Sequence, residues 1–67
     1  MINVILNGKK VQVPENLSLR DCVVHLGLQP ETIAIEHNLE IVKRKDWAAR
    51  NVKEGDTIEI VHFVGGG

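Results

Sequence analysis

Short apolar runs separated by turn residues divide the chain into several strands and one helix. Residues 2–6 and 9–13 are the first two runs. The pair Asn7-Gly8 lies between them and favours a tight hairpin turn, because both residues tolerate positive φ. The second run alternates polar and apolar side chains, as a strand with one buried face does, and Pro14 ends it. The start of the chain therefore predicts a β-hairpin.

A helical pattern follows the hairpin. Four apolar residues recur at the spacing of one helical face, namely Leu19, Cys22, Val23 and Leu26. Ser18 is a favourable N-cap residue, and the carboxylate of Asp21 suits the positive end of the helix dipole. Gly27 fits the left-handed position that ends many helices, and Pro30 prevents continuation. These signals predict one helix with a single apolar stripe.

The second half of the chain contains three further strand-like runs. The runs rich in Ile and Val, which favour strands, are residues 32–36, 40–42 and 57–63. Residues 37–39 predict a turn, and the polar segment 43–50 around Trp47 predicts a loop with one helical turn. This order predicts an α+β fold in which a small mixed sheet packs on one helix. We expect one domain over residues 1–64 and a flexible glycine tail over 65–67.

Composition narrows the function classes. The 67 residues include eight basic and nine acidic side chains, for a net charge of −1, so no overall field favours nucleic acid or an anionic membrane. No stretch approaches the ~20 apolar residues of a membrane span. One cysteine and three scattered histidines do not predict a zinc site, and a lone thiol suits a reducing compartment such as the cytoplasm. The chain is also too small to hold a preorganised catalytic shell, so we do not expect an enzyme.

The alternation of side chains along the last strand predicts a docking surface. Ile58 and Ile60 fall on one face, whereas Glu59, Val61 and Phe63 fall on the other. If the two isoleucines face the core, Val61 and Phe63 point to the open side of the sheet. Exposed apolar side chains in such a place favour contact with a partner. The alternative is that a loop covers this face, or that a bulge shifts the alternation.

Other residues with chemical potential have simpler structural interpretations. The basic run at residues 43–45 could contact an acidic partner surface, but Asp46 interrupts it, and mixed charge is the norm on a solvated face. Cys22 lies on the apolar stripe of the helix, where a thiol behaves as a small hydrophobe. We expect Trp47 against the edge of the core, with an interface as the alternative. The histidines are expected at the surface or in turns.

The chain ends in three glycines directly after an apolar run, and this ending is the most informative feature of the sequence. The α-carboxylate of Gly67 is a possible reactive handle. Because glycine lacks a side chain, the segment Val64, Gly65 and Gly66 could thread into a channel that is too narrow for larger residues. We therefore interpret the protein as a carrier whose working group is its last atom. A frayed chain end is the alternative.

Three segments of the chain carry a family resemblance. They are INVILNGKKVQVP, SLRDCVVHLGL and IAIEHNLEIVKRKDWAARNVKEGDTIEIVHFVGGG, and they cover almost the whole sequence. Their most specific parts are Trp47 within KRKDWA, the turn EGDTIEIV and the ending VGGG. With these motifs the chain resembles the ThiS-type sulfur carriers of thiamine biosynthesis, which are ubiquitin-like β-grasp proteins. One departure is Asn38-Leu39, where many relatives carry Asn-Gly.

The resemblance implies a fold and a mechanism. The first and last strands would pair in parallel at the centre of the sheet. An E1-like, ThiF-type enzyme would adenylate the carboxylate of Gly67, and a sulfur donor such as a cysteine desulfurase relay would convert it to a thiocarboxylate. A ThiG-type thiazole synthase would then receive the sulfur. ATP and Mg²⁺ would belong to the activating partner, and this chain would bind no cofactor or metal.

Other function classes stay open at this point. The near relatives that deliver sulfur to molybdopterin also end in Gly-Gly. A ubiquitin-like modifier would use the same adenylation but would form an isopeptide bond with lysine. A β-grasp binding module would need no tail chemistry, so deletion of Gly66 and Gly67 would leave its function intact. A nucleic-acid contact through residues 43–45 is the weakest alternative, and the absence of binding at moderate salt would exclude it.

Overall fold

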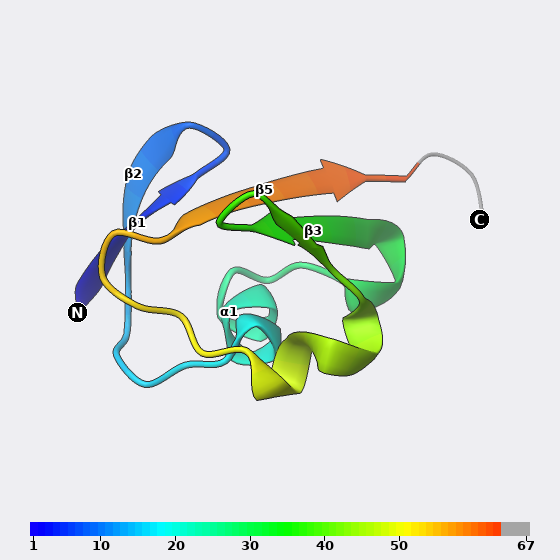
Figure 1. The fold of residues 1–67 in the computed structure, drawn as a ribbon, viewed down its shortest axis with the longest axis horizontal. Helices are drawn as coiled ribbons and strands as arrows, with labels where there is room; N and C mark the ends of the chain where they lie inside the picture. The colour runs from blue at the N-terminus through cyan, green and yellow to red at the C-terminus, as the bar shows by residue number, and fades with distance from the viewer. Residues whose placement is uncertain (64–67) are drawn as a thin grey trace.

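The computed structural model describes residues 1–63, which form a sheet with one helix and two 3₁₀ helices (Figure 1). The elements, in chain order, are β1 (Ile2–Leu6), β2 (Lys9–Val13), α1 (Leu19–His25), the 3₁₀ helix η1 (Pro30–Thr32), β3 (Ile33–His37), β4 (Glu40–Val42), the 3₁₀ helix η2 (Arg44–Ala49) and β5 (Thr57–His62). The predictions for Val64 to Gly67, including the flexible tail, lie outside the described residues.

Within these residues the sheet has five strands in the order β2-β1-β5-β3-β4. β1 and β5 run parallel, with Ile5 beside Thr57 and Leu6 beside Ile58, and the other neighbouring strands are antiparallel. The parallel pairing of the first and last strands is therefore confirmed. Figure 1 shows α1 and η2 on one side of the sheet, and β5 crosses the molecule toward the C-terminal end.

The β1–β2 hairpin follows the sequence prediction. Asn7 and Gly8 have φ values of 49° and 83°, so both occupy the left-handed region that this turn requires. The antiparallel register pairs Leu6 with Lys9 next to the turn. The side chain of Asn7 has a further role: its Oδ1 accepts a hydrogen bond from the N–H of Ile60 at 2.7 Å, and its Nδ2 donates to the carbonyl of Ile60 at 3.2 Å. The turn residue thus also joins the hairpin to β5.

Both ends of α1 are capped as the sequence predicts. The hydroxyl of Ser18 accepts a hydrogen bond from the N–H of Asp21 at 3.1 Å, and the Asp21 carboxylate accepts one from the N–H of Ser18 at 3.2 Å, which completes a capping box. At the other end Gly27 has a φ of 74°. The N–H of Leu28 donates to the carbonyl of Val23 at 3.0 Å, as in a Schellman motif.

Several boundaries in the second half differ from the prediction, including the end of β5, which stops at His62 and not at residue 63. Pro30 begins a short 3₁₀ turn that includes Thr32, because its fixed φ suits the first position of a helical turn. β3 therefore starts one residue later than predicted and continues through His37. The segment predicted as a loop with one helical turn forms η2, a six-residue 3₁₀ helix.

The core lies between the sheet and the two elements α1 and η2. Its residues are almost all aliphatic, and within residues 1–63 they are Val4, Val13, Leu19, Cys22, Val23, Ile33, Ile35, Val42, Trp47, Val52, Ile58 and Ile60. Trp47 is only 1% exposed, and its indole N–H donates to the carbonyl of Val42 at 2.9 Å. The prediction that Trp47 lies against the core is therefore confirmed, and the indole fixes η2 to the end of β4.

Candidate functional site

The alternation predicted for β5 is present in the structure. Ile58 and Ile60 are buried on the side of α1, whereas Val61 on the opposite side is 60% exposed and Glu59 is half-buried. Pairing with β3 places Val61 opposite Ala34 and Glu59 opposite Glu36. No described loop or bulge removes Val61 from solvent.

We call the part of the uncovered side of the sheet that lies on β3, β4 and β5 the open face, and define it by Ala34, Glu36, Ile41, Glu59 and Val61. Glu36 is the cross-strand neighbour of both Glu59 on β5 and Ile41 on β4, so these side chains share one surface. Neither glutamate forms an ion pair within residues 1–63. Like charges that face each other across a strand pair are unfavourable. The open face is therefore an apolar surface with two uncompensated carboxylates at its centre.

Phe63 lies one residue beyond β5, where strand alternation no longer governs its direction. Its N–H donates to the carbonyl of Thr32 at 2.8 Å, and its side chain is 54% exposed. Phe63 lines a groove of about 460 Å³ on the side of η2. We call it the Phe63 groove, lined by Pro30, Glu31, Ile33, Lys43, Arg44, Trp47 and Phe63. The structure thus places Val61 and Glu59 together, and associates Phe63 with a second surface.

The start of β5 is held by a polar cluster around Asp56. The carboxylate of Asp56 accepts hydrogen bonds from the Nε2 of His37 at 2.8 Å, the backbone N–H of Lys53 at 2.8 Å and the side-chain amide of Asn38 at 3.2 Å. Burial alone would raise the pKa of Asp56, but these hydrogen bonds, with the nearby charge of His37, outweigh it and hold the pKa below its usual value. The cluster fixes the β3–β4 turn to the first residues of β5.

This cluster corrects the expectation that the histidines lie at the surface or in turns. His37 is the last residue of β3, and it is 5% exposed. Side chains in a strand point to alternate faces, so the His37 side chain lies on the same core side of β3 as Ile33 and Ile35. Asp56 provides the hydrogen-bond partner that a buried imidazole requires. The sequence signal was the alternation of Ile33, Ile35 and His37, which continues the buried face by one residue.

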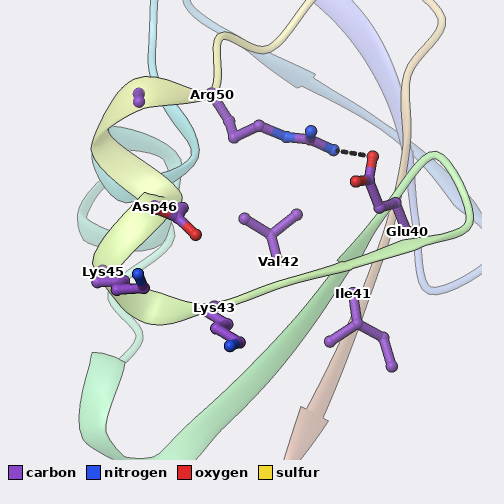
Figure 2. Close-up of a pocket in the computed structure, with 8 residues that line it drawn as sticks. Glu40, Ile41, Val42, Lys43, Lys45, Asp46 and Arg50 are labelled. Atoms are coloured by element: carbon purple, nitrogen blue, oxygen red, sulfur yellow. Dashed lines mark hydrogen bonds and ion pairs between the residues drawn. The ribbon is translucent and has the colours of Figure 1, made fainter.

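A second hollow, of about 410 Å³, lies between β4 and η2 (Figure 2). Figure 2 shows Arg50 reaching from the end of η2 toward Glu40, and the Nη2 of Arg50 lies 2.9 Å from the Oε1 of Glu40. Lys43, Lys45 and Asp46 border the same hollow. Because the Glu40 side chain is 68% exposed, this ion pair contributes at most about 1 kcal/mol to stability.

Cys22 occupies the core position that the helical stripe predicts. It is 3% exposed, and burial together with the charge of Asp21 raises the pKa of its thiol. Such a thiol is a poor nucleophile. Among residues 1–63 no three His, Cys, Asp or Glu side chains cluster as metal ligands do. The described part of the chain also contains no helix with the length and apolar character that crossing a membrane requires.

The architecture defines a class of protein. A small mixed sheet that packs on one helix, with its first and last strands parallel, is the ubiquitin-like β-grasp arrangement. The crystal structure of the thiamine biosynthesis protein ThiS from Geobacter metallireducens has the same fold, with a TM-score of 0.86 and 35% identity, over 98% of this chain and 100% of that one. The model of the ThiS family matches residues 3–67, and this chain belongs to the ThiS family.

The similar proteins include one sulfur carrier of about the same length as this chain and two much longer thiazole synthases. The sulfur carrier protein ThiS of Bacillus subtilis is 35% identical over 63 residues, which cover 92% of this chain and 96% of that protein. The thiazole synthases of Magnetococcus marinus and Paramagnetospirillum magneticum are 39% and 33% identical over 92% and 98% of this chain. The matched segments are only 19% and 20% of those two synthases, so this chain spans about a fifth of their length.

Sequence reasoning missed three features of the site. The hydrogen bonds between Asn7 and Ile60 of β5 were not predicted, because the hairpin turn by itself is a sufficient reason for an asparagine at this position. The cluster around Asp56 includes His37 and Asn38, which lie 19 and 18 positions earlier in the sequence, and no local pattern connects them to Asp56. Glu36 joins the open face only through the pairing of β3 with β5, which periodicity does not reveal.

Proposed function

We propose that this chain is a sulfur carrier of thiamine biosynthesis and that the carboxylate of Gly67 is its working group. The observation that supports this most directly is the match to the ThiS family, which extends through the three glycines at residues 65–67. The likeness to the Bacillus subtilis carrier, over nearly its full length, agrees with this proposal. In this role the chain is not an enzyme, and its place of action is the cytoplasm.

The chemistry begins with a poor electrophile. A carboxylate resists nucleophilic attack because its negative charge is delocalised over two oxygens. An E1-like, ThiF-type partner, which binds ATP and Mg²⁺, joins the Gly67 carboxylate to AMP and releases pyrophosphate. Hydrosulfide then displaces AMP. Where a cysteine desulfurase relay supplies the sulfur as a persulfide, the persulfide displaces AMP to give an acyl disulfide, and a second thiol must reduce its S–S bond, which releases the thiocarboxylate and leaves a disulfide between that thiol and the relay cysteine. With hydrosulfide the product is a thiocarboxylate, in which one sulfur replaces one oxygen of Gly67, and one proton is released.

The fold suits this chemistry because β5 leads directly to the glycines. Asn7 fixes the middle of β5 to the hairpin, and the Asp56 cluster fixes its first residues. A strand held at these points fixes where Phe63 lies in the domain, so a docked partner receives the last four residues from a defined starting point. We propose that Val64, Gly65 and Gly66 thread into the partner. We also propose that the partner docks on Glu59 and Val61 of the open face and on Phe63 at the end of β5.

The recipient of the sulfur is proposed to be a ThiG-type thiazole synthase. Two proteins named thiazole synthase contain a segment similar to this chain, which supports a functional pairing of the two activities. A further relative, the sulfur carrier protein TtuB of Thermus thermophilus, is 36% identical over 88% of this chain, and its name gives sulfur carriage without an acceptor. Sulfur carriage for another acceptor, including molybdopterin, is therefore the alternative, and a ubiquitin-like modifier or a binding module without tail chemistry ranks below it.

The test is intact-mass spectrometry of the chain after incubation with an E1-like activating enzyme, ATP, Mg²⁺ and sulfide. We expect a mass gain that equals the exchange of one oxygen for sulfur, and no gain in a variant that lacks Gly67. The activating enzyme must first be shown to modify another carrier. With that control satisfied, an unchanged mass would make the binding-module interpretation preferable, whereas lysine-linked conjugates would favour a modifier. Transfer of labelled sulfur to a thiazole product distinguishes the acceptors.

A further inference from the structure

The proposed function restricts where a partner must touch this domain. Four residues, Val64 to Gly67, follow the last described residue, Phe63. Even a fully extended chain of four residues spans only ~14 Å. An enzyme that acts on the carbonyl carbon of Gly67 must therefore bring its active site within that distance of Phe63. The active site of such an enzyme therefore lies close to the surface around Phe63 whenever it works.

The Phe63 groove is part of this surface. Its floor is apolar, because the buried side chains of Ile33 and Trp47 line it. Phe63 forms one wall and leaves more than half of its surface in solvent. A half-exposed aromatic ring over an apolar floor is a favourable anchor for an apolar side chain of a partner.

The rim of the groove is basic. Lys43 and Arg44, at the start of η2, line the groove, and Lys45 follows them. None of the three forms an ion pair within residues 1–63, whereas Arg50 at the end of η2 pairs with Glu40 (Figure 2). Glu31 is the acidic side chain on the groove. Unpaired surface cations are common, but these lie where a partner must approach.

The two surfaces near the end of β5 therefore differ in charge. The open face has the carboxylates of Glu36 and Glu59, and the Phe63 groove has the cations of Lys43 and Arg44 with Glu31 as its one acidic side chain; none of these groups forms an ion pair within residues 1–63. Charges of one sign at an interface select partners of the opposite sign and reject others. The groove thus fits a partner segment that is both acidic and apolar.

We propose that the adenylating enzyme inserts such a segment into the Phe63 groove. Its carboxylates pair with Lys43 and Arg44, and an adjacent apolar side chain packs on Phe63. This proposal rests on the proposed function, because it requires an enzyme that acts on Gly67. It adds a second, oppositely charged docking surface to the open face and names the chemistry of its occupant.

The experiment measures steady-state adenylation of the full chain by the E1-like enzyme, with the release of pyrophosphate as the readout. The test variant combines Lys43→Glu and Arg44→Glu, and the control combines Lys9→Glu and Arg20→Glu. The control makes the same charge change on exposed residues of β2 and α1, neither of which lines the Phe63 groove. Circular dichroism and thermal melting confirm that both variants are folded.

We expect the test variant to raise KM about tenfold with little change in kcat, and the control to change KM less than twofold, because rim charges act mainly on association. The difference should shrink as salt is added. For the apolar part, Phe63→Ala should raise KM and Phe63→Leu should restore most of the native value. Equal KM values in the test and control variants would overturn the groove proposal alone. If the native chain is not adenylated by a competent enzyme, the proposed function is wrong and the groove proposal falls with it.

Discussion

Leu39 occupies a backbone conformation that its side chain disfavours. It is the second residue of the β3–β4 turn, with a φ of 70°, next to Asn38 with a φ of 52°. Both central residues of this kind of turn need positive φ, which suits Asn and Gly. A residue with a Cβ in the left-handed region is destabilised by roughly 1–2 kcal/mol. Leu39 is 85% exposed, so packing returns little of this energy.

Replacement of Leu39 should therefore stabilise the protein. Full burial of a leucine contributes roughly 1.5–3 kcal/mol, so the small buried part of Leu39 contributes only about 0.2–0.5 kcal/mol. Leu39→Asn relieves the strain, since Asn is enriched in the left-handed region, and should gain about 1 kcal/mol in unfolding free energy. Leu39→Gly relieves it fully but loses ~0.5–1 kcal/mol to the greater flexibility of the unfolded chain. We expect a smaller gain for glycine.

The assay is thermal unfolding combined with urea titration. For a domain of this size, 1 kcal/mol corresponds to a change in Tm of about 4–8 °C. Leu39→Ala is the matched control, because it keeps the Cβ and the strain while it removes the rest of the side chain. We expect its stability to be equal to, or slightly below, that of the native chain. Asn and Gly variants no more stable than the Ala variant would refute the strain argument.

Three further predictions concern residues that hold β5 and η2 in place. Asp56→Asn should lower the unfolding free energy by about 2 kcal/mol at neutral pH, because hydrogen bonds to a charged acceptor are lost. The pKa of Asp56 is lower in the folded state than in the unfolded state, so the charged carboxylate stabilises the fold fully above the unfolded-state pKa and loses this effect as the pH falls through the folded-state pKa. The unfolding free energies of the native and Asp56→Asn proteins, measured by urea titration, should therefore converge below about pH 4. A difference in unfolding free energy that does not narrow there would contradict this. Asn7→Gly keeps the turn but removes both bonds to Ile60, and should cost about 1–2 kcal/mol, whereas an unchanged urea midpoint would show that those bonds contribute nothing. Trp47→Phe leaves the buried carbonyl of Val42 without its donor and should lower the unfolding free energy by about 2 kcal/mol, while circular dichroism shows that the fold is retained. A decrease in unfolding free energy no larger than that of a conservative core exchange would argue against a contribution from the hydrogen bond.

Much of the local structure could be predicted from the sequence. The turn residues Asn7 and Gly8, the N-cap Ser18, and Gly27 after the end of α1 each adopt a backbone conformation that their residue type favours. The alternation of Ile58, Ile60 and Val61 along β5 predicted which side faces the core, because side chains in a strand must point to alternate faces. These features depend on residues within one turn or strand of each other, so short windows of sequence contain the necessary information.

The tertiary structure decided the features that join distant segments. The pairing of Glu36 with Glu59 places two like charges at the centre of the open face, and it depends on the antiparallel contact of β3 with β5. The Phe63 groove exists because Phe63, η1, the start of β3 and the start of η2 border one hollow, which places Lys43 and Arg44 on the same groove as the last described residue. The sequence by itself determined most of the elements, the buried faces of α1 and β5, and the glycine ending, since these follow from local preferences and from alternation. Strand order and the charges that surround the end of β5 required the packed molecule, because long-range contacts fix them and no local pattern encodes them.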